Sequence, residues 1–332
     1  MERIDSFTSH SSLKIATAQN LAHTTISVPM IEEITPRWLL SFLPWVSVEA
    51  GTYRVNKRRK ILSSEERSCA NEYGEKAIDL ISCPKGEPIL PQTFADYEEK
   101  PREYPLSLVQ TILRVNTRVS DIYNHPINQL PEQMRLTIEA MKEHQEWEMI
   151  NNQEFGLVNS APPSMRIQTK RGAPTPDDMD ELLSRVWKKP AFFLAHPKAI
   201  AAFGRECTRR GVPPAAANIF GSPFITWRGV PIVPCDKLLV DGKSWTDSSS
   251  GTTSILLMRV GESEQGVVGL HQPGIPEETK NTPSLSVKFA GIDNKAVASY
   301  VLSLYFTAAV LTDDALGMLE NVEVGHYHDY NK

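Results

Sequence analysis

The stretch TPDDMDELLSRVWKKPAFFLAHPKAI, residues 175–200, predicts a helix, a strand and a second helix in immediate succession. Thr175 is a preferred N-cap residue, and Pro176 suits the first helical position. Asp177 and Asp178 follow, where the helix dipole favours negative charge. The next apolar residues recur at helical spacing and predict a helix with one buried face: Met179, Leu182, Leu183, Val186 and Trp187.

The strand and the second helix follow with equally clear boundaries. AFFLA, residues 191–195, comes directly after Pro190 and is typical of a strand buried on both faces. Pro197 suits the start of the second helix, and Gly211 suits its C-terminal stop. The inward residues of this helix are expected to be Ile200, Phe203 and Cys207.

The longest predicted helix lies in INQLPEQMRLTIEAMKEHQEWEMINN, residues 127–152. Pro131 suits its first position. About 24 residues would span roughly 36 Å, which makes this helix a spine rather than part of a small enzyme domain. One face is marked by Met134, Ile138, Met141 and Met149.

Residues 1–46 are predicted to form an N-terminal arm, since they are rich in Ser, Thr and His. Extended, this segment would reach roughly 150 Å, whereas a compact domain of this chain's length has a radius of gyration of about 20 Å. The arm is therefore either disordered or lies on something other than its own subunit. Its end, WLLSFLPW at residues 38–45, is too apolar to stay in water, so at least that part is expected to dock.

Several segments show strand patterns. Residues 46–62 predict two strands about an Ala50–Gly51 turn, and residues 224–234 predict two short strands about Arg228–Gly229. Residues 255–271 predict a hairpin with a turn between Gly261 and Gly266.

Other segments are less regular. Residues 63–105 are polar and contain several prolines, so we expect irregular structure with a strand that returns to the body. Residues 106–123 fit a strand and a helix equally well. The apolar run from Ala296 is rich in β-branched and aromatic residues and predicts a long strand, after which Thr312 is expected to cap a short helix.

Composition excludes several classes of protein. The chain has 332 residues with ordinary globular values of 41% hydrophobic and 23% charged. A net charge of −5 gives no electrostatic footprint for nucleic acid or an anionic membrane. The best candidate for a membrane span, residues 296–311, is shorter than the roughly 20 residues required. Four cysteines lie in no metal-ligand spacing and are expected to be free thiols: Cys69, Cys83, Cys207 and Cys235.

No catalytic template fits the chain, which has no phosphate loop, dinucleotide fingerprint or Gly-x-Ser-x-Gly elbow. His326 and His328 could ligate a metal, but no third ligand lies nearby and a frayed terminus is the alternative. The Asp177–Asp178 and Asp313–Asp314 pairs follow capping threonines, so helix-start electrostatics explains them. Cys207 is expected to be unreactive core.

Trp147 and Trp187 are expected to be core or contact residues.

Parts that protrude from a subunit, such as the predicted arm, are expected to contact neighbouring copies. Repeated contacts of this kind close into rings or shells. The residues therefore predict a self-assembling structural protein without a catalytic, cofactor or metal site.

Long unbroken stretches resemble known proteins. Residues 175–203 and the ending YFTAAVLTDDALGMLENV resemble a segment of tailed-phage major capsid proteins of the Hong Kong 97 type. The chain is also similar, from about Ile34 to Val324, to the family-2A encapsulins, which are bacterial nanocompartment shell proteins. The stretches that carry this likeness are TPRWLL, VEAGTYRVN, PQTFADYEEKPREYPLS, RLTIEAMKE, ECTRRGVPP, TWRGVPIVP and RVGESEQGVVGL.

The resemblance implies an α+β chain with the Hong Kong 97 phage-like capsid fold. It places an N-terminal arm at 1–46 and an extension loop at 47–104. A peripheral domain with the spine helix would take 105–160 and 284–332, and an axial domain facing the five-fold vertex would take 161–283. No cyclic-nucleotide-binding insertion is apparent, which fits the 2A group over its 2B relatives.

The resemblance also implies a function. The family builds closed icosahedral shells, commonly of sixty identical subunits, with pores at the symmetry axes and an arm that lies across neighbouring subunits. Its usual cargo is a cysteine desulfurase of sulfur metabolism, enclosed in the bacterial cytoplasm through that enzyme's disordered N-terminal region. No cofactor, nucleic acid or membrane is expected.

The resemblance to the family assigns roles to only a few residues of this chain. By fold analogy, residues 208–221 approach the five-fold axis, where Arg209, Arg210 and Gly211 would belong to a pore loop with an anion preference. An ordinary solvated helix end fits the same residues. A phage or prophage major capsid protein is the alternative within the structural class, and a soluble enzyme is the alternative outside it.

Overall fold

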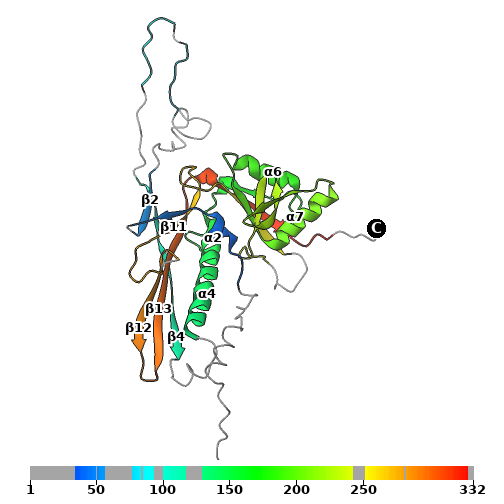
Figure 1. The fold of residues 1–332 in the computed structure, drawn as a ribbon. Helices are drawn as coiled ribbons and strands as arrows, with labels where there is room; N and C mark the ends of the chain where they lie inside the picture. The colour runs from blue at the N-terminus through cyan, green and yellow to red at the C-terminus, as the bar shows by residue number, and fades with distance from the viewer. Residues whose placement is uncertain are drawn as a thin grey trace, which may run out of the picture. The chain divides into compact units, whose positions relative to one another are not determined.

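The computed structural model separates into two compact units: Met1–Glu49 with Leu106–Lys332 (unit 1), and Ala50–Pro105 (unit 2) (Figure 1). Most of the predicted arm, residues 57–76, Cys69 among them, and His328 lie outside the described residues. The structure describes residues 34–49, 51–56, 77–83, 85–92, 100–116, 129–241, 251–279 and 282–327.

The first sheet of unit 1 is built around one long strand, β13 (Val297–Val310). β4 (Ser107–Asn116), β12 (Leu285–Ile292) and β11 (Val267–His271) each pair antiparallel with it. β1 (Trp45–Ser47) then joins β11 in parallel. The long strand predicted after Ala296 is confirmed, and the segment that fitted both strand and helix is a strand over its described part.

The predicted spine helix is α4 (Gln129–Asn151), which packs against β4 and β13 (Figure 1). It begins two residues before Pro131, because a proline is tolerated in the first turn, where the N–H groups have no intrahelical acceptor. All four residues of its predicted face belong to or pack against one core cluster, so the face is confirmed: Met134, Ile138, Met141 and Met149.

The second sheet of unit 1 has seven strands. In spatial order they are β5 (Arg166–Gln168), β14 (Leu316–Glu323), β10 (Thr252–Met258), β6 (Phe192–Ala195), β9 (Val230–Pro234), β8 (Ser222–Trp227) and β7 (Ala215–Ile219). Two short helical segments precede β5: α5 (Leu157–Ser160) and η2 (Pro163–Met165). The two strands predicted about Arg228–Gly229 are therefore confirmed as β8 and β9.

The helix, strand and helix predicted from residues 175–200 form as expected. α6 (Pro176–Arg185) begins with a capping box between Thr175 and Asp178, and α7 (Pro197–Arg209) ends before Gly211, whose φ is 69°. His196 caps α7 by accepting the Lys198 N–H at its Nδ1, 3.1 Å away.

β6 is buried on both faces because its residues alternate between two cores. Phe192 and Leu194 belong to the cluster that also holds α4. Phe193 and Ala195 belong to the cluster beneath α6 and α7. Of the two alternatives for the tryptophans, the core one is wrong, since Trp147 is 38% exposed and Trp187 is 61% exposed, and the contact one stays a prediction.

The apolar end of the predicted arm packs within its own chain. It forms a short helix, α2 (Trp38–Phe42), with Leu39 fully buried in the same core cluster as α4 and β6. The expectation that WLLSFLPW docks is therefore confirmed, whereas the expectation that the arm lies on something other than its own subunit is wrong for these residues. The aromatic side chains of β8 and β6 cover it instead: Phe224 lies 5.1 Å from Trp38, and Phe192 lies 5.1 Å from Phe42, between ring centroids.

Two predicted strand pairs are wrong. β1 and β2 (Thr52–Val55), on either side of Ala50–Gly51, do not pair, since β1 joins β11 and β2 joins β3 (Arg102–Pro105) in unit 2. β10 and β11 likewise enter different sheets, although a turn still joins them. In both cases the two strands that follow each other in the sequence pair with strands from other parts of the chain and not with each other.

The segment after β13 also differs from the prediction. Only a 3₁₀ turn, η3 (Asp313–Ala315), follows Thr312, and that threonine makes no side-chain cap. β14 begins immediately after it and pairs antiparallel with β10. Burial accounts for the difference, because β14 is apolar along most of its length and lies inside the seven-stranded sheet.

Unit 2 contains the antiparallel pair β2 and β3, in which Arg54 and Glu103 form an exposed ion pair at 2.7 Å. Its other described residues, 77–83 and 85–92, form no helix or strand, as expected for the proline-containing segment. Among the helices that the structure describes in either unit, none combines the length and apolar character that crossing a membrane requires.

Candidate functional site

A cluster of charged side chains anchors the end of the arm to the spine helix. Glu143 of α4 accepts hydrogen bonds from the N–H and hydroxyl of Thr35, at 2.8 and 2.9 Å, and from Arg37 at 3.0 Å. Arg37 also contacts Glu139 at 2.6 Å, and Lys237 contacts Glu143 at 2.8 Å. We call these residues, together with Glu146, the arm anchor.

The electrostatics of the arm anchor differ between its two central acids. Burial pushes the pKa of Glu143 upward, but hydrogen bonds from Lys237 and Thr35 outweigh it and hold the pKa below its usual value. Glu146, one turn further along α4, is 1% exposed and accepts the Leu39 N–H at 3.0 Å. Burial raises the pKa of Glu146 to about 7, because one hydrogen bond offsets only part of the lost hydration.

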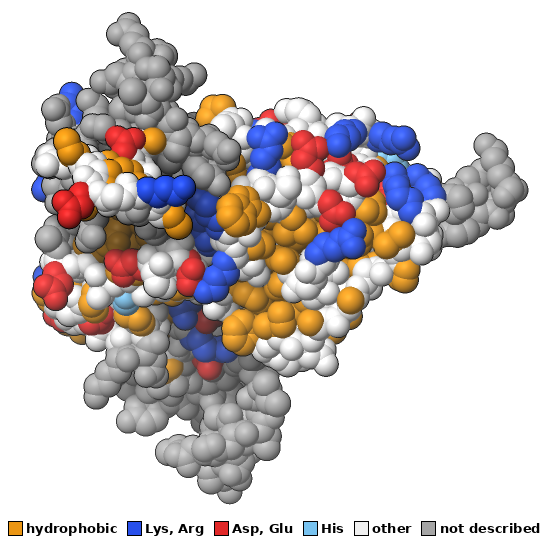
Figure 2. Space-filling model, turned by 90° about the horizontal axis from the view of Figure 1, so that it is seen from above, with side chains coloured by type: hydrophobic (Ala, Val, Ile, Leu, Met, Phe, Trp, Pro, Cys, Tyr) orange, Lys and Arg blue, Asp and Glu red, His pale blue; other side chains and the backbone are white. Residues whose placement is uncertain are grey.

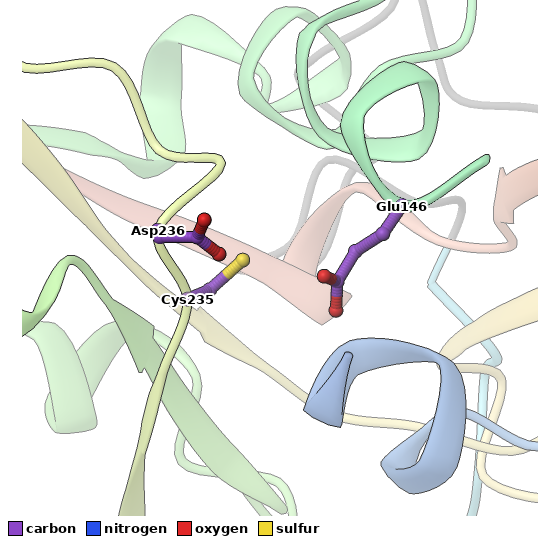
Figure 3. A group of neighbouring side chains, drawn as sticks. All are labelled: Glu146, Cys235 and Asp236. Carbon is purple, nitrogen blue, oxygen red and sulfur yellow. The ribbon is translucent and has the colours of Figure 1, made fainter. Parts of the chain in front are cut away.

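Glu146 also lies beside Cys235 and Asp236 (Figure 3), and one potential ligand atom from each lies within 4.8 Å of the others. This mixture of carboxylates and a thiol is of a kind that can bind a metal ion. Here, however, the ammonium of Lys237 already lies 2.7 Å from Asp236 and neutralises its charge. Burial also raises the pKa of the Cys235 thiol far above its usual value, which disfavours the thiolate that a metal requires. The group, in which Glu146 and Cys235 are buried and Asp236 is exposed, therefore fits an extension of the arm anchor better than a metal centre.

The three residues predicted for a pore loop lie together at the end of α7. Arg209 is the last helical residue, Arg210 is the cap, and Gly211 supplies the left-handed backbone that ends the helix. Both guanidinium groups contact Glu206, one at each carboxylate oxygen, and the Arg209 contact is 2.7 Å. Glu206 is only 4% exposed, so one buried carboxylate compensates about half of the predicted positive charge.

Glu206 was missed at the level of the sequence, although a signal for it was present. A Glu three and four residues before two arginines on a helix is the spacing at which side chains meet. The prediction of a pore loop rested on the two arginines alone, because the other residues of α7 marked an apolar face. The burial of Glu206 among these apolar residues could be found only from the structure.

The structure also places two other residues that the sequence offered for chemistry. Cys207 is fully buried, and burial raises the pKa of its thiol to about 11, which confirms unreactive core. His326 contacts Glu323 at the end of the described chain. His328, with which it could have ligated a metal, lies outside the described residues.

Helix-start electrostatics explains one aspartate pair but not the other. Asp178 is a member of the α6 capping box. Asp314 instead accepts hydrogen bonds from Arg259 and Lys188, both at 2.7 Å. Burial alone would raise the pKa of Asp314, but these cations and the Thr312 hydroxyl lower it well below its usual value. The interpretation of Asp314 as a helix-dipole residue was therefore wrong.

Comparison with known proteins gives consistent results. The family described as "Type 2A encapsulin shell protein SrpI-like" matches residues 63–326. A protein named "Type 2A encapsulin shell protein SrpI" from Synechococcus elongatus is 54% identical over 318 residues, which are 96% of each chain. A "Type 2A encapsulin shell protein" from Mycolicibacterium paratuberculosis is 50% identical over 313 residues, covering 94% of this chain and 95% of the relative.

Solved structures agree with these relatives. The cryo-electron microscopy structure of the holo-SrpI encapsulin complex from Synechococcus elongatus is 52% identical, with a TM-score of 0.77 over 96% of this chain and 99% of that chain. The capsid of a native GTA particle has a TM-score of 0.57 at 12% identity, over 90% and 93% of the two chains. The second likeness shows the capsid fold alone.

Proposed function

The chain belongs to the SrpI-like type 2A encapsulin shell proteins, and from this premise we propose what its compartment contains and how many copies build it. It is a structural protein of a capsid-like compartment and not an enzyme. The observation that carries the proposal is the 54% identity with a named shell protein over 96% of both chains.

Exposed apolar surface supports assembly from many identical copies. Figure 2 shows hydrophobic side chains gathered on the face of unit 1 that is turned to the viewer. Monomeric proteins rarely leave large contiguous apolar areas in water. We assign this area to contacts between copies in a closed icosahedral shell of sixty subunits.

Native mass spectrometry of particles from the chain expressed alone tests the number of copies. Sixty chains of 37.1 kDa give a mass of about 2.2 MDa. A single mass close to this value supports the proposal. A different discrete mass contradicts the copy number, and a small soluble oligomer contradicts the closed shell.

The cargo that we propose is a cysteine desulfurase of sulfur metabolism, held in a compartment of the bacterial cytoplasm. Since the shell protein is not an enzyme, the chemistry of the compartment belongs to what it encloses. The test is to co-express the chain with a cysteine desulfurase that carries its disordered N-terminal region and with one that lacks it. Desulfurase activity that sediments with the particles only when the region is present supports the proposal, and equal exclusion of both contradicts it.

We also propose that the chain is divided into the arm, extension loop, peripheral domain and axial domain given above. Two observations support this division. Unit 2, Ala50–Pro105, lies within three residues of the boundaries expected for the extension loop at 47–104. The seven-stranded sheet collects most of its strands from 161–283, the expected axial domain. We now place β14 in the axial domain as well, because it pairs with β10 and β5, although its residues fall within 284–332.

A further inference from the structure

A segment after α7 combines exposure with a lack of charge. Residues 211–227 contain no Asp, Glu, Lys or Arg, in a chain of which 23% is charged. Eight of the eleven residues 211–221 are nevertheless exposed. Surfaces that remain in water usually carry charges, whereas the cores of protein interfaces are depleted in them. This combination is therefore typical of a surface that a partner covers.

The same segment forms a free sheet edge. β7 is the last strand of the seven-stranded sheet, so one row of its backbone groups lacks a strand partner among the described residues. Proteins that keep such an edge in water protect it with charged side chains, prolines or bulges. β7, with the sequence AAANI, carries no charge and no proline, and it pairs with β8 without a register shift. Nothing in the strand itself opposes contact with another molecule.

Phe220, at the tip of the β7–β8 hairpin, is the second unusual feature. Its φ is 51° and that of Gly221 is 76°, so both residues of the turn are left-handed. Such two-residue turns favour Asn-Gly, and a bulky side chain in this conformation is an outlier. The Phe220 ring is 66% exposed, although it lies 5.1 Å from the Phe42 ring, between centroids. Within one subunit, a strained phenylalanine that is mostly in water serves little purpose.

We propose that the β7 edge and Phe220 form a contact with a second copy of this chain. Aromatic side chains at the centre of an uncharged surface are typical of residues that dominate binding energy. A copy of the chain is the partner because a compartment built from one protein must cover its exposed edges with itself. The contact between Phe220 and Phe42 joins this surface to the end of the arm. The proposal rests on the assembly described under the proposed function.

Phe220→Asn is the decisive variant. Asn-Gly is the preferred turn sequence, so the substitution relieves backbone strain and should keep or improve folding of the subunit. It removes the ring, so we expect about a tenfold or greater rise in the concentration of unassembled subunit. Subunit folding is measured by circular dichroism, and assembly by analytical ultracentrifugation across a protein dilution series. Assembly at the wild-type concentration would overturn the proposal.

A charge substitution on the strand provides the second arm of the test. Ala216→Lys places an ammonium on the exposed β7 edge, and Ser184→Lys places the same charge on the exposed surface of α6. We expect the first variant to assemble at least tenfold more weakly and the second to assemble like wild type. Equal loss in both would show a general charge effect and overturn the proposal.

The outcomes also separate this inference from the proposed function. If the wild-type chain forms no closed particles, the proposed function fails and this contact fails with it. If wild-type and Phe220→Asn shells assemble alike, only the contact proposed here is overturned. Normal shells of Phe220→Asn that no longer hold cargo would identify the partner as cargo and likewise overturn it.

Discussion

Glu146 of α4 accepts the backbone N–H of Leu39 at 3.0 Å, and both residues are almost completely buried. The contact joins two segments 107 residues apart in the chain. Glu143, three residues earlier on α4, contacts Lys237 and Arg37 and has a lowered pKa, whereas burial raises the pKa of Glu146 to about 7. The end of the arm is therefore held by one acid that stays charged and by another that titrates near neutral pH.

We predict that Glu146→Gln removes a pH dependence of stability. The contribution of Glu146 is fully present below about pH 4.5 and is lost as pH rises through about 7, because the folded protein then carries a buried charge. Glutamine stays neutral and still offers an oxygen to Leu39. Between pH 5 and 8 the variant should gain up to about 3 kcal/mol of unfolding free energy relative to wild type.

Urea denaturation of both proteins at pH 5, 6, 7 and 8 measures this difference. The pH dependence of wild-type stability alone cannot isolate the effect of Glu146, because burial also lowers the pKa of His196 to about 4. That group gives stability that is present above about pH 6.5 and lost as pH falls through about 4, the opposite sign. A constant difference between wild type and Glu146→Gln across this range would contradict the raised pKa of Glu146.

We expect the two adjacent aspartates at the start of α6 to differ in their effect on stability. Asp178 accepts hydrogen bonds from the N–H and hydroxyl of Thr175, at 3.0 and 2.7 Å, and is buried. Asp178→Ala should lower the free energy of unfolding by about 1–3 kcal/mol, since buried donors lose their acceptor. Asp177→Ala should cost about 0.3–1 kcal/mol, because exposed Asp177 contributes only through the helix dipole. Denaturant midpoints of the two variants check this order, and equal losses would count against the capping box.

A glycine in the sheet and a glycine in a helix that covers it should respond to alanine in opposite directions. A Cβ at Gly317 of β14 would lie 2.9 Å from side-chain carbons of both Leu182 and Val186, so Gly317→Ala should destabilise by about 1–3 kcal/mol through overpacking. A Cβ at Gly204 of α7 would meet nothing within 4 Å. Gly204→Ala should stabilise by about 0.5–1 kcal/mol, because alanine loses less backbone entropy in a helix.

Thermal unfolding of both glycine variants provides the measurement. The melting temperature should fall for Gly317→Ala and rise for Gly204→Ala. A rise for Gly317→Ala would show that α6 moves away from β14 at little cost, contrary to the close packing between them.

We propose that the end of α7 lines a five-fold pore, as the resemblance implies, and we predict that it controls anion entry. Removing Arg209 and Arg210 alone would leave the buried Glu206 without its cations, so folding and charge would change together. The variant with Glu206→Gln, Arg209→Ala and Arg210→Ala avoids this and should slow the entry of a small anion several-fold. Glu206→Gln alone leaves both positive charges uncompensated and should speed it.

Stopped-flow quenching of a dye enclosed in the shell measures entry. Iodide serves as the anion and acrylamide as the neutral control, which should enter all shells equally. Unchanged iodide entry in both variants would leave the two arginines as an ordinary helix end.

Local features of the sequence determined the elements between Thr175 and Gly211. A capping threonine, prolines at helix starts and the spacing of apolar residues act within a few residues, so they can be read without the fold. The face of the spine helix was predicted for the same reason. The resemblance to shell proteins was likewise carried by long local stretches.

Only the tertiary structure decided which strands pair and what covers the arm. The turns at Ala50–Gly51 and after Met258 give hairpin signals, but their flanking strands pair with distant segments. Turn residues bend the chain without choosing a partner, because that choice depends on edges left open elsewhere in the fold. The burial of Glu206 and the contact of Glu146 with Leu39 also depend on surroundings assembled from distant parts of the chain. The sequence by itself therefore determined the local elements, and the packing between them decided the arm anchor and the exposed β7 edge.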